Sequence, residues 1–266
     1  DNLTGVKGSF NQAITGLQNA LALNFIVNVD IVVNFRNYKE LLTIIEFFHK
    51  LGVNEFDLLT LMPYGRAWDL NFDQLIYDLN DFQPIFEQVL EYGKENNLVI
   101  WCNRFPVNYF EDKEYMLKDI ETKLYHEILG ERKNKFNLFL KSGKKLSCLN
   151  LKRCSYCFIK DFCAQLFYFN NLVKNNKTEA EIFKNPFCQS ENNFKKIKLK
   201  SLLDGRYLDL ESFFEFYINN LHFYKSLRCS ECLYFNQCRG LSFNDILNKG
   251  FKILKPTPNK NKKIKK

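Results

Sequence analysis

Six of the nine cysteines in this chain lie in two clusters with the same spacing. Both clusters read C-x2-C-x5-C: "CSYCFIKDFC" covers residues 154–163, and "CSECLYFNQC" covers residues 229–238. Cysteines three residues apart turn their sulfur atoms toward a shared point, which suits tetrahedral thiolate ligation of one metal centre. Disulfide frameworks more often spread their cysteines along the chain. The repeated spacing therefore predicts two metal sites of similar construction.

Each cluster supplies three thiolates, whereas a closed tetrahedral site needs four ligands. Cys148 precedes the first cluster, and Cys188 lies between the two clusters. One assignment of ligands is Cys148, Cys154, Cys157 and Cys163 for the first centre, with Cys188, Cys229, Cys232 and Cys238 for the second. Exchange of ligands between the centres stays open, because two-cluster proteins often ligate in that way. Cys102, on an apolar segment, is interpreted as an ordinary buried thiol.

The identity of the metal does not follow from the spacing, since zinc and iron–sulfur clusters both accept four thiolates. The basic residues beside the clusters would offset the negative charge of either kind of site; they are Arg153, Lys160, Arg228 and Arg239. Histidine, a frequent zinc ligand, is nearly absent near the clusters. This absence slightly favours iron and sulfur.

The elements that would position these sites begin with the first hundred residues, where helix-like and strand-like patterns alternate. Runs rich in β-branched and apolar residues predict strands at "FIVNVDIVVN", "EFDLLTLM" and "LVIWCN". Amphipathic periodicity predicts helices between them, one stopped at Gly52 and one running from Asp73 to about residue 97, divided or kinked at Pro84. This alternation implies right-handed crossovers and a parallel sheet, with ligand sites at the carboxyl ends of the strands.

The pattern changes near residue 110, which sets the expected domain organisation. Residues 1–110 form the strand–helix part, and residues 111–145 predict one long polar helix that acts as a connector. Residues 146–243 form a cysteine-rich metal-binding domain, and residues 244–266 form a basic, disordered tail.

Composition and charge exclude several classes of function. The chain has 266 residues, 46% of them hydrophobic, and a formal charge of +8 that comes mostly from the lysines near its end. The body is close to neutral, so we expect no nucleic-acid partner. The sequence lacks a long apolar window and a signal-peptide pattern, so we expect neither a membrane span nor secretion, and we predict a cytoplasmic protein.

Together these features resemble the C-terminal part of a radical S-adenosylmethionine (radical SAM) enzyme that carries a SPASM-like auxiliary-cluster domain. The resemblance spans most of residues 1–240, and the C-x2-C-x5-C triplets are its most specific part. "NVDIVVNFRNYKELLTIIEFFHKLGVNEFDLLTLMPYGRA" is similar to two strand–helix steps of the family's barrel. The resemblance implies an α/β fold, the second half of a partial (β/α)6 TIM-type barrel, followed by the cysteine-rich metal-binding domain.

The resemblance also implies a role for several residues and partners. Radical SAM barrels bind S-adenosylmethionine across the strand ends, which makes Asn34, Met62, Pro63 and Gly65 candidate contacts of that cofactor. The alternative interpretation is structural, because strand-end Asn residues cap loops and Pro-x-Gly forms ordinary turns. Enzymes of the family modify a peptide or protein side chain or mature another enzyme. Their auxiliary [4Fe–4S] clusters hold substrate or carry electrons, and a flavodoxin or ferredoxin is the expected electron donor.

Two departures from the family limit what the resemblance implies. The C-x3-C-x2-C motif that holds the SAM-cleaving cluster occurs nowhere in the 266 residues, so we expect this chain by itself to be inactive and to lack the first half of the barrel. Phe167 and Ser242 occupy the places of a further cysteine after each triplet, so the ligation need not follow the SPASM pattern in detail. A degenerate protein remains an alternative, as does a non-catalytic, zinc-organised binding or scaffold module.

Overall fold

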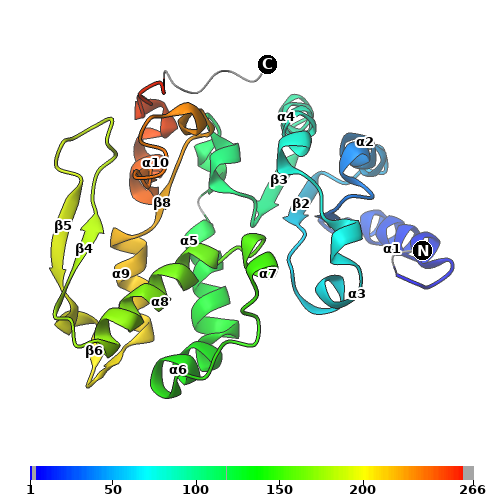
Figure 1. Cartoon of the computed structure of the whole chain (residues 1–266). Coiled ribbons are helices and arrows are strands. Elements are labelled where there is room, and N and C mark those ends of the chain that lie inside the picture. The colour runs from blue at the N-terminus through cyan, green and yellow to red at the C-terminus, as the bar shows by residue number, and fades with distance from the viewer. Residues whose placement is uncertain (2–3, 118, 260–266) are drawn as a thin grey trace. The chain divides into compact units, whose positions relative to one another are not determined.

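The computed structural model describes residues 1, 4–117 and 119–259 of the chain. The chain separates into two compact units, Asp1–Phe105 and Pro106–Lys266 (Figure 1). The division falls a few residues before the boundary expected near residue 110.

A parallel sheet forms the centre of the first unit, and its strands coincide with the three predicted segments. Within the described residues the strand order is β1–β2–β3, with bounds Asn28–Val33, Glu55–Thr60 and Val99–Asn103. Leu58 of the central strand pairs with Ile31 on one side and with Cys102 on the other. Leu58 is fully buried, as expected for the middle of a parallel sheet. The described part of this sheet is not closed into a barrel, so the partial barrel stays a prediction.

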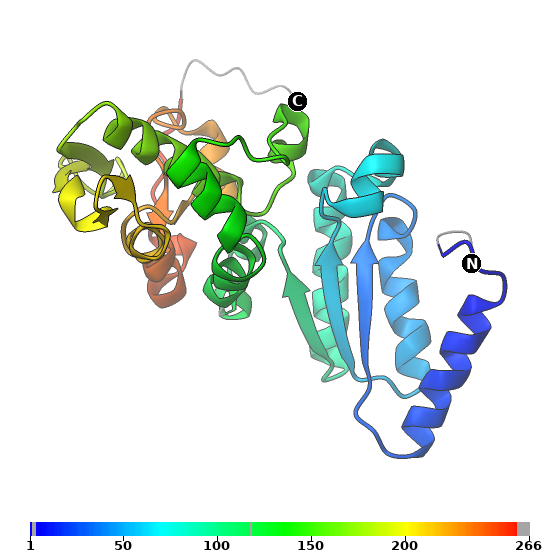
Figure 2. The ribbon, with the colours of Figure 1, turned by 90° about the horizontal axis from the view of Figure 1, so that it is seen from below.

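Helices connect these strands as the amphipathic patterns predict. Those described in this unit are α1 Ser9–Ala22, α2 Leu41–Lys50, α3 Gly65–Leu75 and α4 Leu79–Glu95. Figures 1 and 2 show α2 and α4 side by side on one face of the sheet. Phe82 and Phe86 of α4 are buried there, and both stack on Phe105, with ring centroids 5.6 and 5.4 Å apart.

The predicted break of the helical region at Pro84 is wrong. The helical region begins at Gly65, before Asp73, and it is interrupted at residues 76–78. Asp78 caps the second helix by accepting a hydrogen bond from the Asn80 backbone N–H at 2.8 Å, a strong helix-start signal. Pro84 lies in the second turn of α4, and the helix continues through it.

The second unit combines helices with short antiparallel strand pairs. Its helices are α5 Ile120–Tyr125, α6 Lys133–Ser142, α7 Leu151–Ser155, α8 Lys160–Lys174, α9 Leu210–Asn220 and α10 Phe243–Lys249. The paired strands are β4 Glu179–Phe183 with β5 Phe194–Lys198, β6 Leu203–Asp204 with β7 Tyr207–Leu208, and β8 Phe223–Tyr224 with β9 Leu241–Ser242.

Aromatic side chains form the core of the second unit. Phe162 is fully buried and contacts Phe136, Phe213 and Tyr217, with ring centroids 5.7, 5.7 and 5.2 Å away. These rings come from α6, α8 and α9, so the core joins three helices. Phe162 directly precedes Cys163, and the core therefore fixes the position of that cysteine.

The predicted connector is not one long helix. Residues 111–145 contain α5, a π-helical turn at His126–Glu131 and α6. The helix ends at Gly143 as predicted, with a positive φ of 72°, which glycine adopts readily. The connector is part of the second unit, because Ile128, Phe136 and Leu140 are buried.

The tail was predicted to be disordered from residue 244, but a helix and buried residues continue beyond that position. Residues 243–249 form α10, and Phe251 and Leu254 are 0% and 2% exposed. The Phe251 N–H donates to Glu114 at 2.8 Å. The lysines at the end of the tail lie outside the described residues.

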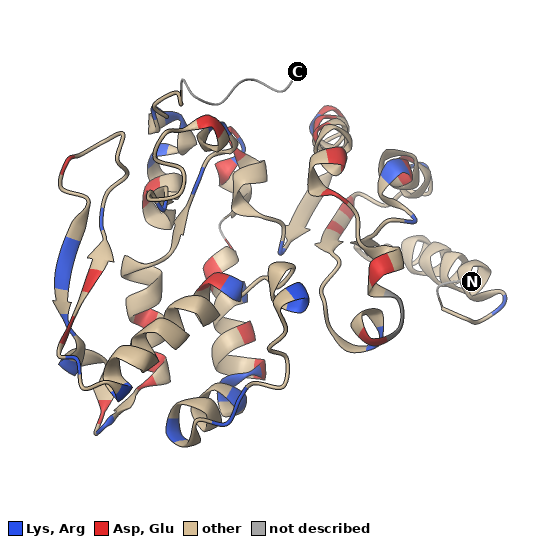
Figure 3. Cartoon of the chain, in the orientation of Figure 1, with Lys and Arg blue, Asp and Glu red and all other residues tan. Residues whose placement is uncertain are grey.

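Two properties of the surface bear on the expected partners. In the part of the chain that the structure describes, no helix combines the length and apolarity needed to cross a membrane. Figure 3 shows basic and acidic residues interspersed along both units.

Candidate metal centres

The first cysteine group, defined as Cys148, Cys154, Cys157 and Cys163, lies around the start of α8. Asn150 begins the short helix α7 by accepting a hydrogen bond from the Arg153 N–H at 3.1 Å. The Cys157 N–H then donates to the Cys154 carbonyl at 3.1 Å, which closes the knuckle between these two cysteines. The local hydrogen bonds therefore produce the turn that C-x2-C predicts.

Three thiols of the first cysteine group act electrostatically on the fourth, that of Cys163. Burial raises the pKa of the Cys163 thiol well above its ordinary value, and the thiols of Cys157, Cys148 and Cys154 raise it further. The Arg132 guanidinium acts in the opposite direction. A group whose thiolates oppose one another in this way is stabilised when a cation neutralises them.

Arg132 supplies a positive charge to the first cysteine group. Its Nη1 lies 4.0 Å from the Sγ of Cys148, and its Nε pairs with the buried carboxylate of Glu127 at 2.8 Å. Glu127 lies near the start of the π-helical turn at His126–Glu131, and Arg132 directly follows the end of this turn. The ion pair holds the guanidinium toward the sulfur.

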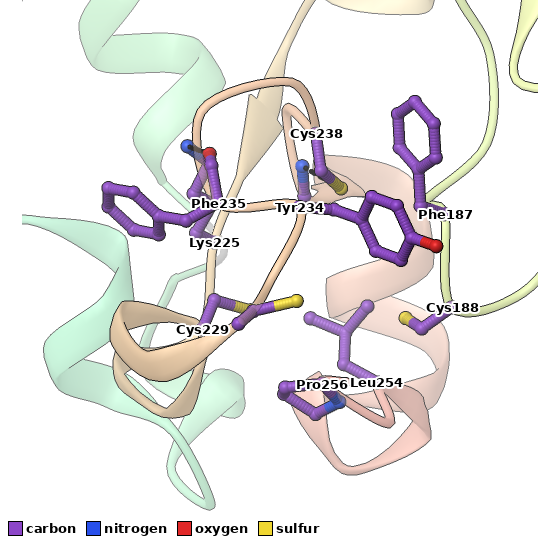
Figure 4. A pocket seen from close by; sticks show the side chains of 11 residues that line it. Phe187, Cys188, Lys225, Cys229, Tyr234, Phe235, Cys238, Leu254 and Pro256 are labelled. Atoms are coloured by element: carbon purple, nitrogen blue, oxygen red, sulfur yellow. Dashed lines mark hydrogen bonds between the residues drawn. The ribbon is translucent and has the colours of Figure 1, made fainter. Parts of the chain in front are cut away.

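The second cysteine group, defined as Cys188, Cys229, Cys232 and Cys238, lines a cavity of about 20 Å³. Figure 4 shows Cys188 reaching this space from the β4–β5 connection, while Cys229 and Cys238 reach it from the loop between β8 and β9. Cys188 is held there by its neighbour, because the ring of Phe187 stacks on Tyr234 with centroids 5.0 Å apart. Burial raises the pKa of Cys229, and the thiols of Cys232, Cys238 and Cys188 contribute in the same direction.

A backbone N–H directed at sulfur marks the second cysteine group. The Gly240 N–H donates to the Sγ of Cys238 at 3.4 Å, an interaction that tunes the potential of thiolate-bound clusters. Gly240 has φ +92°, and a Cβ added there would lie 2.0 Å from the Tyr224 carbonyl oxygen. Only glycine permits this approach of the cysteine loop to β8.

An ion-pair network fixes the short helix Leu227–Glu231, which carries Cys229. Arg228 Nε and Ser226 Oγ both donate to the carboxylate of Glu111, each at 2.7 Å. Arg228 also donates to the backbone carbonyls of Phe251 and Leu254. The network ties the cysteine helix to the start and to the end of the second unit.

The donor set of each cysteine group is four thiols, which both zinc and an iron–sulfur cluster accept. Among the described residues, no three Cys, His, Asp or Glu side chains are placed so as to hold one metal ion. Thiolates around one zinc ion lie about 3.8 Å apart, as tetrahedral bonds of about 2.3 Å require. The cavity that the second cysteine group lines, about 20 Å³, is about the size of one water molecule and does not distinguish between the two metal groups.

The four candidate cofactor contacts in the first unit follow strand ends. Asn34 directly follows β1, and Met62, Pro63 and Gly65 follow β2, so parallel pairing brings both segments to one edge of the sheet. The Asn34 amide donates to the Val32 carbonyl at 2.9 Å and accepts from the Arg36 N–H at 3.0 Å. Both ends of this amide are engaged in capping the loop. Gly65, at φ +55°, starts α3.

The ninth cysteine, Cys102, belongs to neither cysteine group. Cys102 lies on β3 of the first unit and is half-buried, where a buried thiol was expected. Sequence reasoning did not find Arg132, Glu111 or Gly240. The Arg-Gly pair after Cys238 was a usable signal, because a glycine beside a ligand often marks close backbone approach.

Comparison with known proteins gives no match to a family model, to a curated protein sequence or to a solved structure.

Proposed function

We propose that the chain binds two auxiliary [4Fe–4S] clusters, one in each cysteine group, and acts as the cluster-bearing C-terminal part of a radical SAM enzyme. The observation that carries the proposal is that each triplet lies near a fourth cysteine outside its own motif. Cys148 joins the first triplet, and Cys188 joins the second. Four thiolates per site complete the ligand set of a [4Fe–4S] cluster.

The first unit supports the radical SAM part of the proposal. Its parallel strands carry Asn34 and the segment 62–65 at one edge, where ligands of α/β sheets bind. We propose S-adenosylmethionine as the ligand of that edge in an enzyme that also supplies the C-x3-C-x2-C cluster. A peptide or protein is the proposed substrate, a flavodoxin or ferredoxin the proposed electron donor, and the cytoplasm the proposed location.

The chain's own residues would hold and tune the clusters. When bound, clusters with four cysteine ligands would supply electron transfer. The Gly240 N–H and the Arg132 guanidinium face sulfur atoms of the second and first groups, respectively. Hydrogen bonds and positive charge at thiolates stabilise the reduced, more negative state of a cluster. The Gly240 N–H and the Arg132 guanidinium would therefore each raise the reduction potential of the cluster that they face.

Anaerobic reconstitution with ferrous iron and sulfide tests the proposal. We expect about eight irons and about eight sulfides per chain, with broad visible absorption, since each cluster contains about four of each. Cys163→Ala and Cys238→Ala should each remove about half of the iron, and Cys102→Ala, the matched control, should remove none. About two zinc ions per chain without visible absorption would instead support the zinc-organised binding module.

A further inference from the structure

A second cavity in the second unit lies apart from the cysteine thiols. Its volume is about 290 Å³, and it is bounded by α8, by β4 and β5 and by the residues around Cys238. Ligand pockets of drug-sized molecules span about 300 to 1,000 Å³. A cavity at the lower end of that range fits a molecule of about the size of an amino acid.

The floor of this cavity is apolar and fixed. Phe169, Ile182, Phe183 and Leu221 line it, and their side chains are between 0% and 3% exposed. They belong to the aromatic core or pack against it, since Phe169 contacts Phe213 with ring centroids 5.3 Å apart. A floor of buried rings and branched side chains provides a preformed surface for the apolar part of a ligand.

Arg239 supplies a positive charge at the cavity wall. Its Nη2 donates to the Leu221 carbonyl at 3.0 Å, and its guanidinium lies 5.7 Å from the centre of the Phe223 ring. In the described ranges no carboxylate lies within ion-pair distance of Arg239, and the Asp161 carboxylate acts on its charge from farther away. A largely desolvated guanidinium with spare N–H donors is the usual partner of a carboxylate or phosphate.

The lining of the cavity also carries a negative charge. Glu181, on β4, lines the cavity and is exposed to solvent. Gln165 and Gln237 add neutral polar groups to the lining. One cation, one anion and an apolar floor match a zwitterion with an apolar side chain better than they match a phosphate, because a phosphate gains nothing from Glu181.

The loop that contains Arg239 borders both cavities. Gln237 and Arg239 line the larger one, while Cys238 and Gly240 line the cysteine cavity. Neighbouring residues of one loop therefore line two different sites. The larger cavity is built from protein side chains alone, so its ligand does not depend on metal in the cysteine groups.

We propose that this cavity binds a free amino acid, or the carboxyl-terminal residue of a peptide, with a large apolar side chain. Arg239 binds the carboxylate, Glu181 faces the amino group of the free amino acid, and the buried floor takes the side chain. Nothing in the two cysteine groups requires such a site, so it is a second binding function of the same unit.

Calorimetric titration of the full chain with three related probes tests the assignment. L-phenylalanine carries both charges, 3-phenylpropionate lacks the amine, and L-phenylalaninamide lacks the carboxylate. We expect saturable binding of phenylalanine and phenylpropionate, with the amide at least tenfold weaker. Equal binding of the amide, or no saturable binding of any probe to the folded chain, overturns the proposal.

Variants separate the two charged contacts. Arg239→Gln should weaken phenylalanine and phenylpropionate at least tenfold, whereas Arg206→Gln, an exposed arginine outside the cavity, should leave both unchanged. Misfolding around the adjacent Cys238 would also weaken binding in Arg239→Gln, so a second variant, distant from the cysteines in sequence, tests the site independently. Glu181→Gln lies on the exposed rim and should weaken phenylalanine without affecting phenylpropionate. Unchanged phenylalanine affinity in both Arg239→Gln and Glu181→Gln also overturns the assignment.

Discussion

Phe187 and Tyr234 stack ring on ring, with centroids 5.0 Å apart and planes within 13° of parallel. The two residues lie in segments that are distant in the sequence, and each adjoins the second cysteine group. Stacked aromatic pairs contribute about 0.5–1.5 kcal/mol beyond the burial of their surface. This pair therefore holds Cys188 beside a triplet that comes more than forty residues later in the chain.

Loss of this stack should release the fourth ligand of the second cysteine group. We expect Phe187→Ala to lower the iron content of the reconstituted protein by up to half, because Cys188 is no longer held at the cavity. Phe187→Tyr keeps the ring and should keep the iron. Equal iron in wild type and Phe187→Ala would show that Cys188 is positioned by something other than the stack.

Replacement of Gly240 should disrupt the same centre through the backbone. A Cβ at this position would lie 2.0 Å from the Tyr224 carbonyl oxygen, and φ is +92°. The dihedral alone costs about 1–2 kcal/mol for an L-residue, and the clash adds to it. We expect Gly240→Ala to reduce the free energy of unfolding by more than about 2 kcal/mol in denaturant titrations.

Gly205 provides the matched control for this prediction. It also has a positive φ, +59°, yet among the described atoms none lies within 4 Å of an added Cβ. Gly205→Ala should therefore cost only the dihedral contribution, about 1–2 kcal/mol. Similar losses in the two variants would mean that β8 moves away from Gly240 at little cost.

The elements of the first unit follow from local patterns, and their boundaries follow less well. The β-branched run before Asn34 predicts β1 because such residues fit a buried parallel strand. The end of α3 was not predicted, since the Asp78 cap competes with the helical periodicity around it. Pro84 was a misleading signal, because the second turn of α4 tolerates it.

For the candidate metal centres, too, the sequence predicts the local turns but not the contacts between distant residues. C-x2-C-x5-C predicts the knuckle turns, because their hydrogen bonds are local to the motif. The reach of Cys188 depends on Phe187 and Tyr234, and the position of Cys229 depends on Glu111, which lies in a different part of the chain. Contacts between distant residues leave no periodic trace in one sequence. Burial of Phe251 likewise overrides the lysine-rich character of its surroundings.

Removal of the Glu111 carboxylate should destabilise the second unit. This carboxylate accepts hydrogen bonds from the hydroxyl of Ser226, which is 3% exposed, and from the guanidinium of Arg228. We expect Glu111→Ala to lower the free energy of unfolding by about 2–3 kcal/mol, since a buried hydroxyl loses its charged acceptor. Thermal or denaturant unfolding measures this loss.

An exposed ion pair of the same unit serves as the reference. Lys249 and Asp245 form an i,i+4 pair at 2.7 Å, with side chains 59% and 39% exposed. Lys249→Ala should cost no more than about 0.5 kcal/mol. A double-mutant cycle of Glu111→Ala with Arg228→Ala should show coupling, and strictly additive losses would exclude the network as a unit.

His222 should make the stability of the protein depend on pH. The side chain is 2% exposed, its Nε2 lies 2.7 Å from the Tyr224 hydroxyl, and burial lowers its pKa to about 3 from an ordinary value of 6.5. Between these two pH values the unfolded chain binds a proton at His222 that the folded chain does not. The free energy of unfolding is therefore fully retained above pH 6.5 and falls as the pH decreases from about 6.5 toward 3. We expect His222→Gln to flatten this dependence in denaturant titrations, by up to about 1.4 kcal/mol for each pH unit. Tyr224→Phe keeps the histidine buried and should keep the slope; a wild-type slope in His222→Gln would show that acidic groups alone produce it.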